Sequence, residues 1–75
     1  MKINKTGNST TEITLNSGTV VLVSYSTAVA CKTASGERFK TEAKWSVTTS
    51  KHITQFFGSK DIETKPQSYF DELLG

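Results

Sequence analysis

Five consecutive polar residues, Thr48-Thr49-Ser50-Lys51-His52, bring together the side chains of this sequence that are best suited to binding an anion. If they open a helix, its free N–H groups and the positive end of its dipole add to three hydroxyls, an ammonium and an imidazole. That combination is typical of phosphate or carboxylate capture. The same residues also suit a simpler role, in which Thr48, Thr49 or Ser50 caps the helix and His52 packs at its rim. Both interpretations stay open from the sequence.

The spacing of apolar residues after this run predicts the helix itself. Ile53, Phe56 and Phe57 stand at i, i+3 and i+4, which places them in one stripe on a helix surface. Gly58 is a typical C-terminal stop. We therefore expect a helix of about two and a half turns that packs its stripe against a sheet.

Residues for covalent or metal chemistry are sparse. Cys31 and His52 could act as a thiol and its base, but the strand pattern places Cys31 in the core, where a buried thiol is unreactive. Asp61 and Glu63 lack the histidine partner or oxygen-rich loop of a metal site. No glycine-rich loop indicates a nucleotide. The sequence therefore predicts no catalytic residue, no metal and no cofactor.

Three strands are predicted before the helix. Residues 11–15 alternate apolar and polar side chains, residues 19–31 are rich in β-branched side chains, and residues 38–47 alternate almost completely. Gly18 and Gly36 end the two connecting turns. The last residue of a three-residue hairpin loop often has a left-handed backbone conformation, which glycine adopts most easily. These features predict a three-stranded antiparallel meander.

The turn lengths also predict the register of the meander. Three-residue loops place all the bulky apolar groups on one face, whereas a slip of one residue would divide them between both faces. The expected cross-strand partners are Ile13 with Val21, Cys31 with Phe39, Val29 with Thr41, Tyr25 with Trp45, and Val23 with Val47.

The opposite face of this predicted sheet is flat and bordered by cations. Its floor consists of four small side chains at alternate positions, Ser24, Ser26, Ala28 and Ala30. It is either an ordinary solvated face or a docking surface for an acidic protein or a phosphate backbone. The residues that would bind a partner there are Ser24, Ser26, Lys32, Arg38, Lys40 and Lys44.

The C-terminal part predicts a last helix. Pro66 opens it, and a short fourth edge strand near Ile62 precedes it. The expected fold class is therefore α+β, a three-stranded antiparallel meander with two short C-terminal helices packed on one face. Residues 1–10 are polar and predicted to be a frayed N-terminus, and residues 11–75 to form a single small domain.

Charge and composition exclude few classes of protein. The net charge of +2 is too small to indicate a nucleic-acid partner by itself. Residues 1–51 carry seven basic and three acidic side chains, whereas residues 52–75 carry two and four. A single cysteine and the lack of a long apolar run favour a soluble chain in a reducing compartment.

Two segments resemble a family of small uncharacterised bacteriophage proteins. Residues 24–30 read SYSTAVA and residues 44–53 read KWSVTTSKHI, similar to a SYxTxVA strand and a KxSxTTxKHI junction in which x at the second position is aromatic. That family often has proline where this chain has Ala28. The resemblance implies a phage-encoded accessory protein and carries over no catalytic residue. The matching positions are Ser24, Tyr25, Thr27, Lys44, Ser46, Thr48, Thr49, Lys51 and His52.

Two binding functions follow from these features. The resemblance favours a non-enzymatic inhibitor or modulator that covers a surface of a host or defence protein, a role that anti-CRISPR proteins exemplify. The basic strands and the helix start favour a nucleic-acid-binding accessory protein. We expect the host-cell cytoplasm as its location, no membrane partner, and room for self-association through Leu73 and Leu74.

Overall fold

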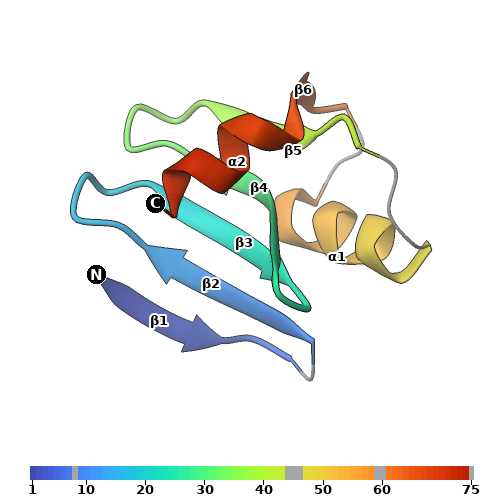
Figure 1. The fold of residues 1–75 in the computed structure, drawn as a ribbon, viewed down its shortest axis with the longest axis horizontal. Coiled ribbons are helices and arrows are strands. Elements are labelled where there is room, and N and C mark those ends of the chain that lie inside the picture. Colours follow the sequence, from blue (N-terminus) through green and yellow to red (C-terminus); the bar gives the residue numbers. More distant parts are fainter. Residues whose placement is uncertain (8, 44–46, 59–60, 75) are drawn as a thin grey trace.

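The computed structural model describes residues 1–7, 9–43, 47–58 and 61–74, and over these it shows one mixed sheet with two helices (Figure 1). The strands lie side by side in chain order. They are β1 (Lys2–Lys5), β2 (Thr10–Thr14), β3 (Val20–Ser24), β4 (Thr27–Lys32), β5 (Arg38–Thr41) and β6 (Glu63–Lys65), and the helices are α1 (Val47–Phe57) and α2 (Gln67–Leu73).

The predicted fold class is therefore wrong in its details, although the class remains α+β. The sheet has six strands rather than three over the described residues, and β6 pairs with β5 in parallel whereas the other neighbours are antiparallel. The polar segment expected to fray contains β1, in which Ile3 pairs with Ile13 of β2. Composition alone does not reveal this strand, because all four of its residues are exposed.

A tight hairpin divides the long β-branched segment that was predicted as one strand. β3 ends at Ser24, β4 begins at Thr27, and these two residues are cross-strand partners. Tyr25 has a φ of 58°, the positive value that the first central residue of a type II′ turn requires. Its N–H donates a 2.6 Å hydrogen bond to the carbonyl of Ser9. Tyrosine is rare at such a position, so the sequence carries no ordinary turn signal there.

A β-bulge in β4 changes which side chains share a face. Leu22 pairs with Ala30 and Val23 pairs with Ala28, which leaves Val29 as the extra residue. Val29 and Ala30 therefore both pack with Leu22, while Ala28 packs on the opposite side with Val23. The register of β4 with β5 is as predicted, but Val29 packs with Ile53 of α1 whereas the Thr41 hydroxyl bonds to Gln67 of α2, so the expected placement of these two residues on one core face is wrong.

The third predicted strand is also shorter than expected. β5 ends at Thr41, whose hydroxyl accepts a hydrogen bond from the N–H of Ala43, and α1 begins at Val47. The predicted pairing of Val23 with Val47 is wrong, since Val47 lies in a helix and is 74% exposed. Tyr25 is a turn residue and pairs with no strand, and Trp45 lies outside the described residues.

Both three-residue turns are confirmed. The N–H of Leu15 donates to Thr19 O over 2.8 Å, and the N–H of Thr33 donates to Glu37 O over 2.8 Å. Gly18 and Gly36 have φ values of 92° and 94°, which residues with a side chain rarely adopt. The partnerships that these turns predict closest to the loops are confirmed as well: Ile13 with Val21 and Cys31 with Phe39.

The helices cover opposite faces of the sheet, rather than one face as predicted. α1 packs Ile53 on Leu22, Val29 and Ala30, and we call this side the α1 face. α2 packs Phe70 on the other side, the α2 face, against a core that includes Val21, Val23, Ala28, Cys31 and Phe39. In Figure 1, α2 lies in front of the sheet and α1 emerges from behind β4.

Both helices use the apolar residues that the sequence indicates. In α1, Ile53 is buried, Phe56 and Phe57 are partly buried, and Gly58 ends the helix with a φ of 71°. In α2, Phe70 is fully buried. No helix in the described parts of the chain is long and apolar enough to span a bilayer.

Candidate functional site

A buried hydroxyl links the sheet to α1. Ser24 at the end of β3 is 2% exposed, and its Oγ lies 3.1 Å from Thr49 Oγ1 and 2.9 Å from His52 Nδ1. One hydroxyl can donate to one of these partners and accept from the other. The His52 ring also lies beside Tyr25, with the ring centroids 6.1 Å apart. The cluster therefore holds the histidine in one orientation at the rim of the helix.

This serine–histidine contact suits orientation better than nucleophilic catalysis. A nucleophile must reach a substrate carbon, and Ser24 Oγ is buried between the sheet and α1. Thr49, itself 4% exposed, occupies the other side of the hydroxyl. The contact thus fixes Nδ1 of His52 and leaves Nε2 as the ring nitrogen without a hydrogen-bond partner among the described residues.

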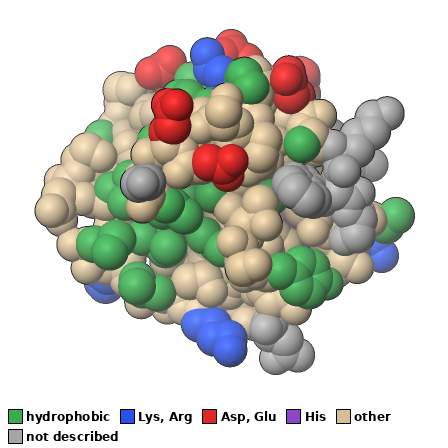
Figure 2. Space-filling view, in the orientation of Figure 1, with side chains coloured by type: hydrophobic (Ala, Val, Ile, Leu, Met, Phe, Trp, Pro, Cys, Tyr) green, Lys and Arg blue, Asp and Glu red, His purple; other side chains and the backbone are tan. Residues whose placement is uncertain are grey.

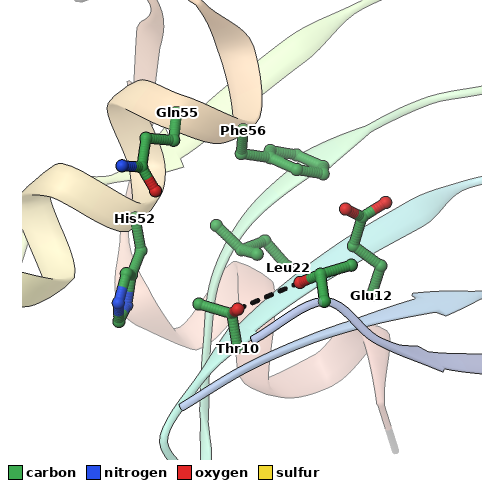
Figure 3. Close-up of a pocket in the computed structure, with 7 residues that line it drawn as sticks. Thr10, Glu12, Leu22, His52, Gln55 and Phe56 are labelled. Atoms are coloured by element: carbon green, nitrogen blue, oxygen red, sulfur yellow. Dashed lines mark hydrogen bonds between the residues drawn. The ribbon is translucent and has the colours of Figure 1, made fainter. Parts of the chain in front are cut away.

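An open groove of about 210 Å³ lies between α1 and β2 on the α1 face. Figure 3 shows His52, Gln55 and Phe56 on its helix side and Thr10 and Glu12 on its strand side. Leu22 forms the floor between them. Thr6 Oγ1 donates a 3.0 Å hydrogen bond to Thr10 Oγ1 at the strand wall. The groove therefore offers an imidazole, an amide, a carboxylate and hydroxyls around an apolar floor.

The size of the groove limits what it can hold. Pockets for drug-sized ligands and cofactors usually exceed about 300 Å³, and this groove is smaller and open on one side. Its dimensions suit one side chain of a docked partner. Within the described residues, no cluster of three or more histidine, cysteine or acidic side chains could hold a metal ion.

The residues of the predicted anion site do not converge. Thr49 and His52 turn toward Ser24, whereas Thr48, Ser50 and Lys51 are exposed. The helix begins at Val47, so the three hydroxyl residues lie within its first turn rather than before it. The residue that precedes Val47 lies outside the described residues.

The predicted flat, open face is absent because α1 covers its middle. Ser24 and Ala30 are buried beneath α1, Ser26 is exposed at the β3–β4 turn, and Lys44 lies outside the described residues. The pairing of Lys32 with Arg38 and of Ala30 with Lys40 keeps these three basic side chains on the α1 face. We call Lys32, Arg38 and Lys40 the basic cluster.

Lys32 also contacts the helix. Its ammonium lies 4.5 Å from the centroid of the Phe56 ring and 5.9 Å from that of Phe57. A cation over an aromatic face is attracted by the ring quadrupole. Lys32 therefore adjoins the C-terminal end of α1, whereas Lys40 lines a pocket with Val47 and Ser50 near the start of the helix. The groove adjoins the side of the same helix that faces β2.

On the α2 face, the one cysteine is unreactive by position. Burial raises the pKa of the Cys31 thiol above its ordinary value of 9.0, although hydrogen bonds to Tyr69 and to the backbone of Phe39 act in the opposite direction. Burial also raises the pKa of Tyr69 above 10.0, and the neighbouring Cys31 adds to that shift. Both groups stay protonated and neutral near pH 7.

A protein family of unknown function, DUF8033, matches residues 1–72, which is nearly the whole sequence. The chain belongs to this family. Comparisons with curated proteins and with solved structures give no match. The family assignment for this DUF8033 chain therefore covers the sheet and both helices, and it brings no activity with it.

Sequence reasoning missed the two features that organise the α1 face of this DUF8033 protein. The groove wall of Thr10 and Glu12 was not predicted, because residues 1–10 were expected to fray and no helix was expected on the face that carries Glu12. Ser24 was expected on an open face because both helices were predicted to pack on the other side of the sheet, whereas α1 covers the face that carries Ser24. The resemblance to SYxTxVA and KxSxTTxKHI was the available signal, since its Ser24, Thr49 and His52 meet in one cluster.

Proposed function

We propose that this protein is a non-enzymatic binding protein whose α1 face covers an acidic surface of a protein partner. By its resemblance to small phage proteins, that partner belongs to the host or to its defence machinery, and the protein acts as an inhibitor or modulator in the host cytoplasm. An anti-CRISPR protein would be one example of this class.

The observation that carries the proposal is the separation of charge between the two helices. α1 has the sequence VTTSKHITQFF, which includes Lys51 and His52 and no acidic residue. α2 has the sequence QSYFDEL, which includes Asp71 and Glu72 and no basic residue. The basic cluster lies on the side of the sheet that carries α1. Glu12 and Glu42 also line pockets beside α1, so the positive charge of this face is concentrated in Lys51 and the basic cluster. A positive area attracts an acidic partner and sets its orientation.

The groove supplies the second contact. Energy at protein interfaces concentrates in a few anchors that fill pockets, while the surrounding charges mainly set orientation and association rate. An anchor side chain in the groove would rest on Leu22 and Phe56 and meet the polar groups of Glu12, His52 and Gln55. Ser24 supports this arrangement because it holds the His52 ring in place.

The test is capture of a partner from infected host lysate by the tagged protein, with and without nuclease. The double variant Arg38→Glu with Lys40→Glu reverses two charges of the basic cluster and leaves Lys32 over Phe56. The matched control, Arg38→Lys with Lys40→Arg, keeps both charges. We expect a nuclease-resistant protein partner that the control retains and the charge-reversed variant loses. Any residual binding by the charge-reversed variant should depend less on salt than wild-type binding does. Equal capture by both variants would remove the α1 face from consideration.

A nucleic-acid partner is the second candidate, and the basic cluster is the observation that favours it. Three cations on adjacent strands could contact successive phosphates. Against it, Phe56 and Phe57 face Lys32 and each other rather than forming an open stacking platform. Loss of the captured material after nuclease treatment would select this candidate.

A further inference from the structure

An apolar row crosses the α2 face and continues beyond the area that α2 covers. Its five members are cross-strand partners in turn, from the edge strand inward: Ile3, Ile13, Val21, Cys31 and Phe39. Val21 and Cys31 are fully buried, Ile13 is half-buried, and Ile3 is 65% exposed. The outer end of the row is therefore apolar side chain in contact with water.

Three leucines widen this exposed area. Leu15 and Leu73 are partly buried against the core of the α2 face, and Leu74 is 42% exposed at the end of α2. We call Ile3, Ile13, Leu15, Leu73 and Leu74 the apolar surface. Figure 2 shows hydrophobic side chains gathered in one continuous area beside α2. A continuous exposed apolar area of this kind marks an interaction site.

Charges of opposite sign border the apolar surface on opposite sides. Asp71 and Glu72 are exposed on α2, along one border. Lys5 is exposed on β1, along the other border, and strand alternation places it on the same face as Ile3. In Figure 2 the area of hydrophobic side chains lies between acidic side chains above it and a basic one below it.

We propose that the apolar surface binds a second copy of this chain, face to face, about a two-fold axis that lies in the interface through its centre and runs broadly along the strands. Such an axis places each copy's apolar surface on the other's, and it brings the β1 border of one copy over the α2 border of the other. Lys5 of each copy then meets Glu72 of its partner. The surface is complementary to itself because its two borders differ in sign.

The edge of the sheet is a poorer place for the second copy. β1 is an edge strand of four residues with a lysine at each end. Short edge strands that carry charged side chains, lysine above all, resist pairing with another strand. The face therefore offers complementary charges, whereas the edge strand is protected against pairing.

The size of the chain adds a reason for association. A domain of this length buries only about 60% of its unfolded surface on folding. Apolar area buried in a dimer would therefore add a large fraction to its total buried surface. The dimer leaves both α1 faces pointing outward. The inference thus goes beyond the proposed function and does not depend on it, because the two use opposite faces of the sheet.

Sedimentation equilibrium across concentrations tests the dimer, with the concentration dependence of the melting temperature as a second readout. The wild-type chain should be a dimer that dissociates on dilution. Ile3→Ser with Leu74→Ser removes exposed apolar groups at both borders of the interface and should raise the dissociation constant by at least about tenfold, since each change counts twice in a two-fold dimer. Lys51→Glu on α1 is the control and should leave it unchanged.

A charge exchange tests the orientation. Lys5→Glu alone and Glu72→Lys alone should each raise the dissociation constant by about three- to tenfold, because each places like charges across the interface twice. An equimolar mixture of these two variants should form a heterodimer close to wild-type affinity, since the new carboxylate of one then faces the new ammonium of the other. The double variant in one chain should restore the homodimer.

The outcomes divide clearly. Dimerisation with recovery in the mixture supports the proposal. A wild-type chain that stays monomeric up to about 1 mM overturns it, whether or not the apolar surface then captures another protein or lipid vesicles. A dimer that ignores the apolar substitutions, or one whose charge variants show no recovery on mixing, overturns it as well. None of these results depends on partner capture through the α1 face.

Discussion

At the scale of single residues, Ser24 and Cys31 show that burial decides the role of a reactive side chain. Ser24 lies 2.9 Å from an imidazole nitrogen, yet it is buried and serves to orient His52. Cys31 carries the single thiol, yet burial keeps it protonated. Both side chains are of types that can act as nucleophiles, and in this fold both serve a structural role.

Removal of the Ser24 hydroxyl should cost stability out of proportion to its size. Ser24→Ala leaves His52 Nδ1 without its partner and takes one hydrogen bond from buried Thr49, so we expect a loss of about 1–3 kcal/mol in the free energy of unfolding. Ser26→Ala, two residues on and exposed, should change it by less than about 0.5 kcal/mol. Urea unfolding measures both. Equal effects from the two variants would show that the Ser24 cluster adds nothing.

Stability should fall as the pH rises above about 9. Burial raises the folded pKa of both Cys31 and Tyr69 above their ordinary values of 9.0 and 10.0. The folded chain therefore keeps protons that the unfolded chain releases, and the free energy of unfolding declines from the unfolded pKa upward until the folded pKa is passed. Cys31→Ala should be less stable at pH 7, because it leaves a cavity, and should show a shallower alkaline decline. The same slope as wild type would refute this account of the thiol.

At the scale of elements, each helix secures one face of the sheet. Ile53 is the buried anchor of α1 and Phe70 that of α2. Gln67 also ties α2 to the sheet, because its amide N–H donates a 2.7 Å hydrogen bond to the carbonyl of Ala28 and its Oε1 accepts one from Thr41 over 2.8 Å. The sheet is therefore a central layer between two helices.

Substitution of either anchor should destabilise the whole domain. Ile53→Ala should cost about 2–5 kcal/mol and Phe70→Ala about 3–5 kcal/mol, because each empties a packed site on a different face. Val47→Ala, in the same helix as Ile53 but 74% exposed, is the control. Denaturant unfolding at pH 7 gives the comparison. A silent Ile53→Ala would restore the predicted arrangement in which one face of the sheet lies open.

Sequence patterns revealed the local elements far better than their arrangement. Glycine turns gave the register of Cys31 with Phe39, and helical spacing located α1, because both depend on residues close together in the chain. Strand alternation could not predict the positive φ of Tyr25 or the β-bulge at Val29. Both depend on contacts with residues distant in the chain, such as the hydrogen bond from Tyr25 N–H to the Ser9 carbonyl. The site was missed for a different reason: Ser24 lies on the face away from Val23, as predicted, but α1 covers that face.

At the scale of the whole molecule, the two faces differ in character. The α1 face carries the basic cluster and a polar groove, and the α2 face carries the apolar surface bordered by acids and Lys5. A molecule of this kind can contact two different surfaces at the same time. That division fits a small protein that associates with itself on one side and binds a partner on the other.

The parallel pairing of β6 with β5 gives this fold a step with no local nucleus. Antiparallel hairpins can close like a zipper from the turn outward, since their first partners are near neighbours in the chain. Every β5–β6 pair instead joins residues 24 positions apart, from Phe39 with Glu63 to Thr41 with Lys65. The chain must therefore lose the full conformational entropy of closing this loop before the first hydrogen bond between β5 and β6 can form. Phe70 lies only a few residues beyond β6, so the largest fully buried side chain among the described residues follows directly after the least local pairing in the sheet.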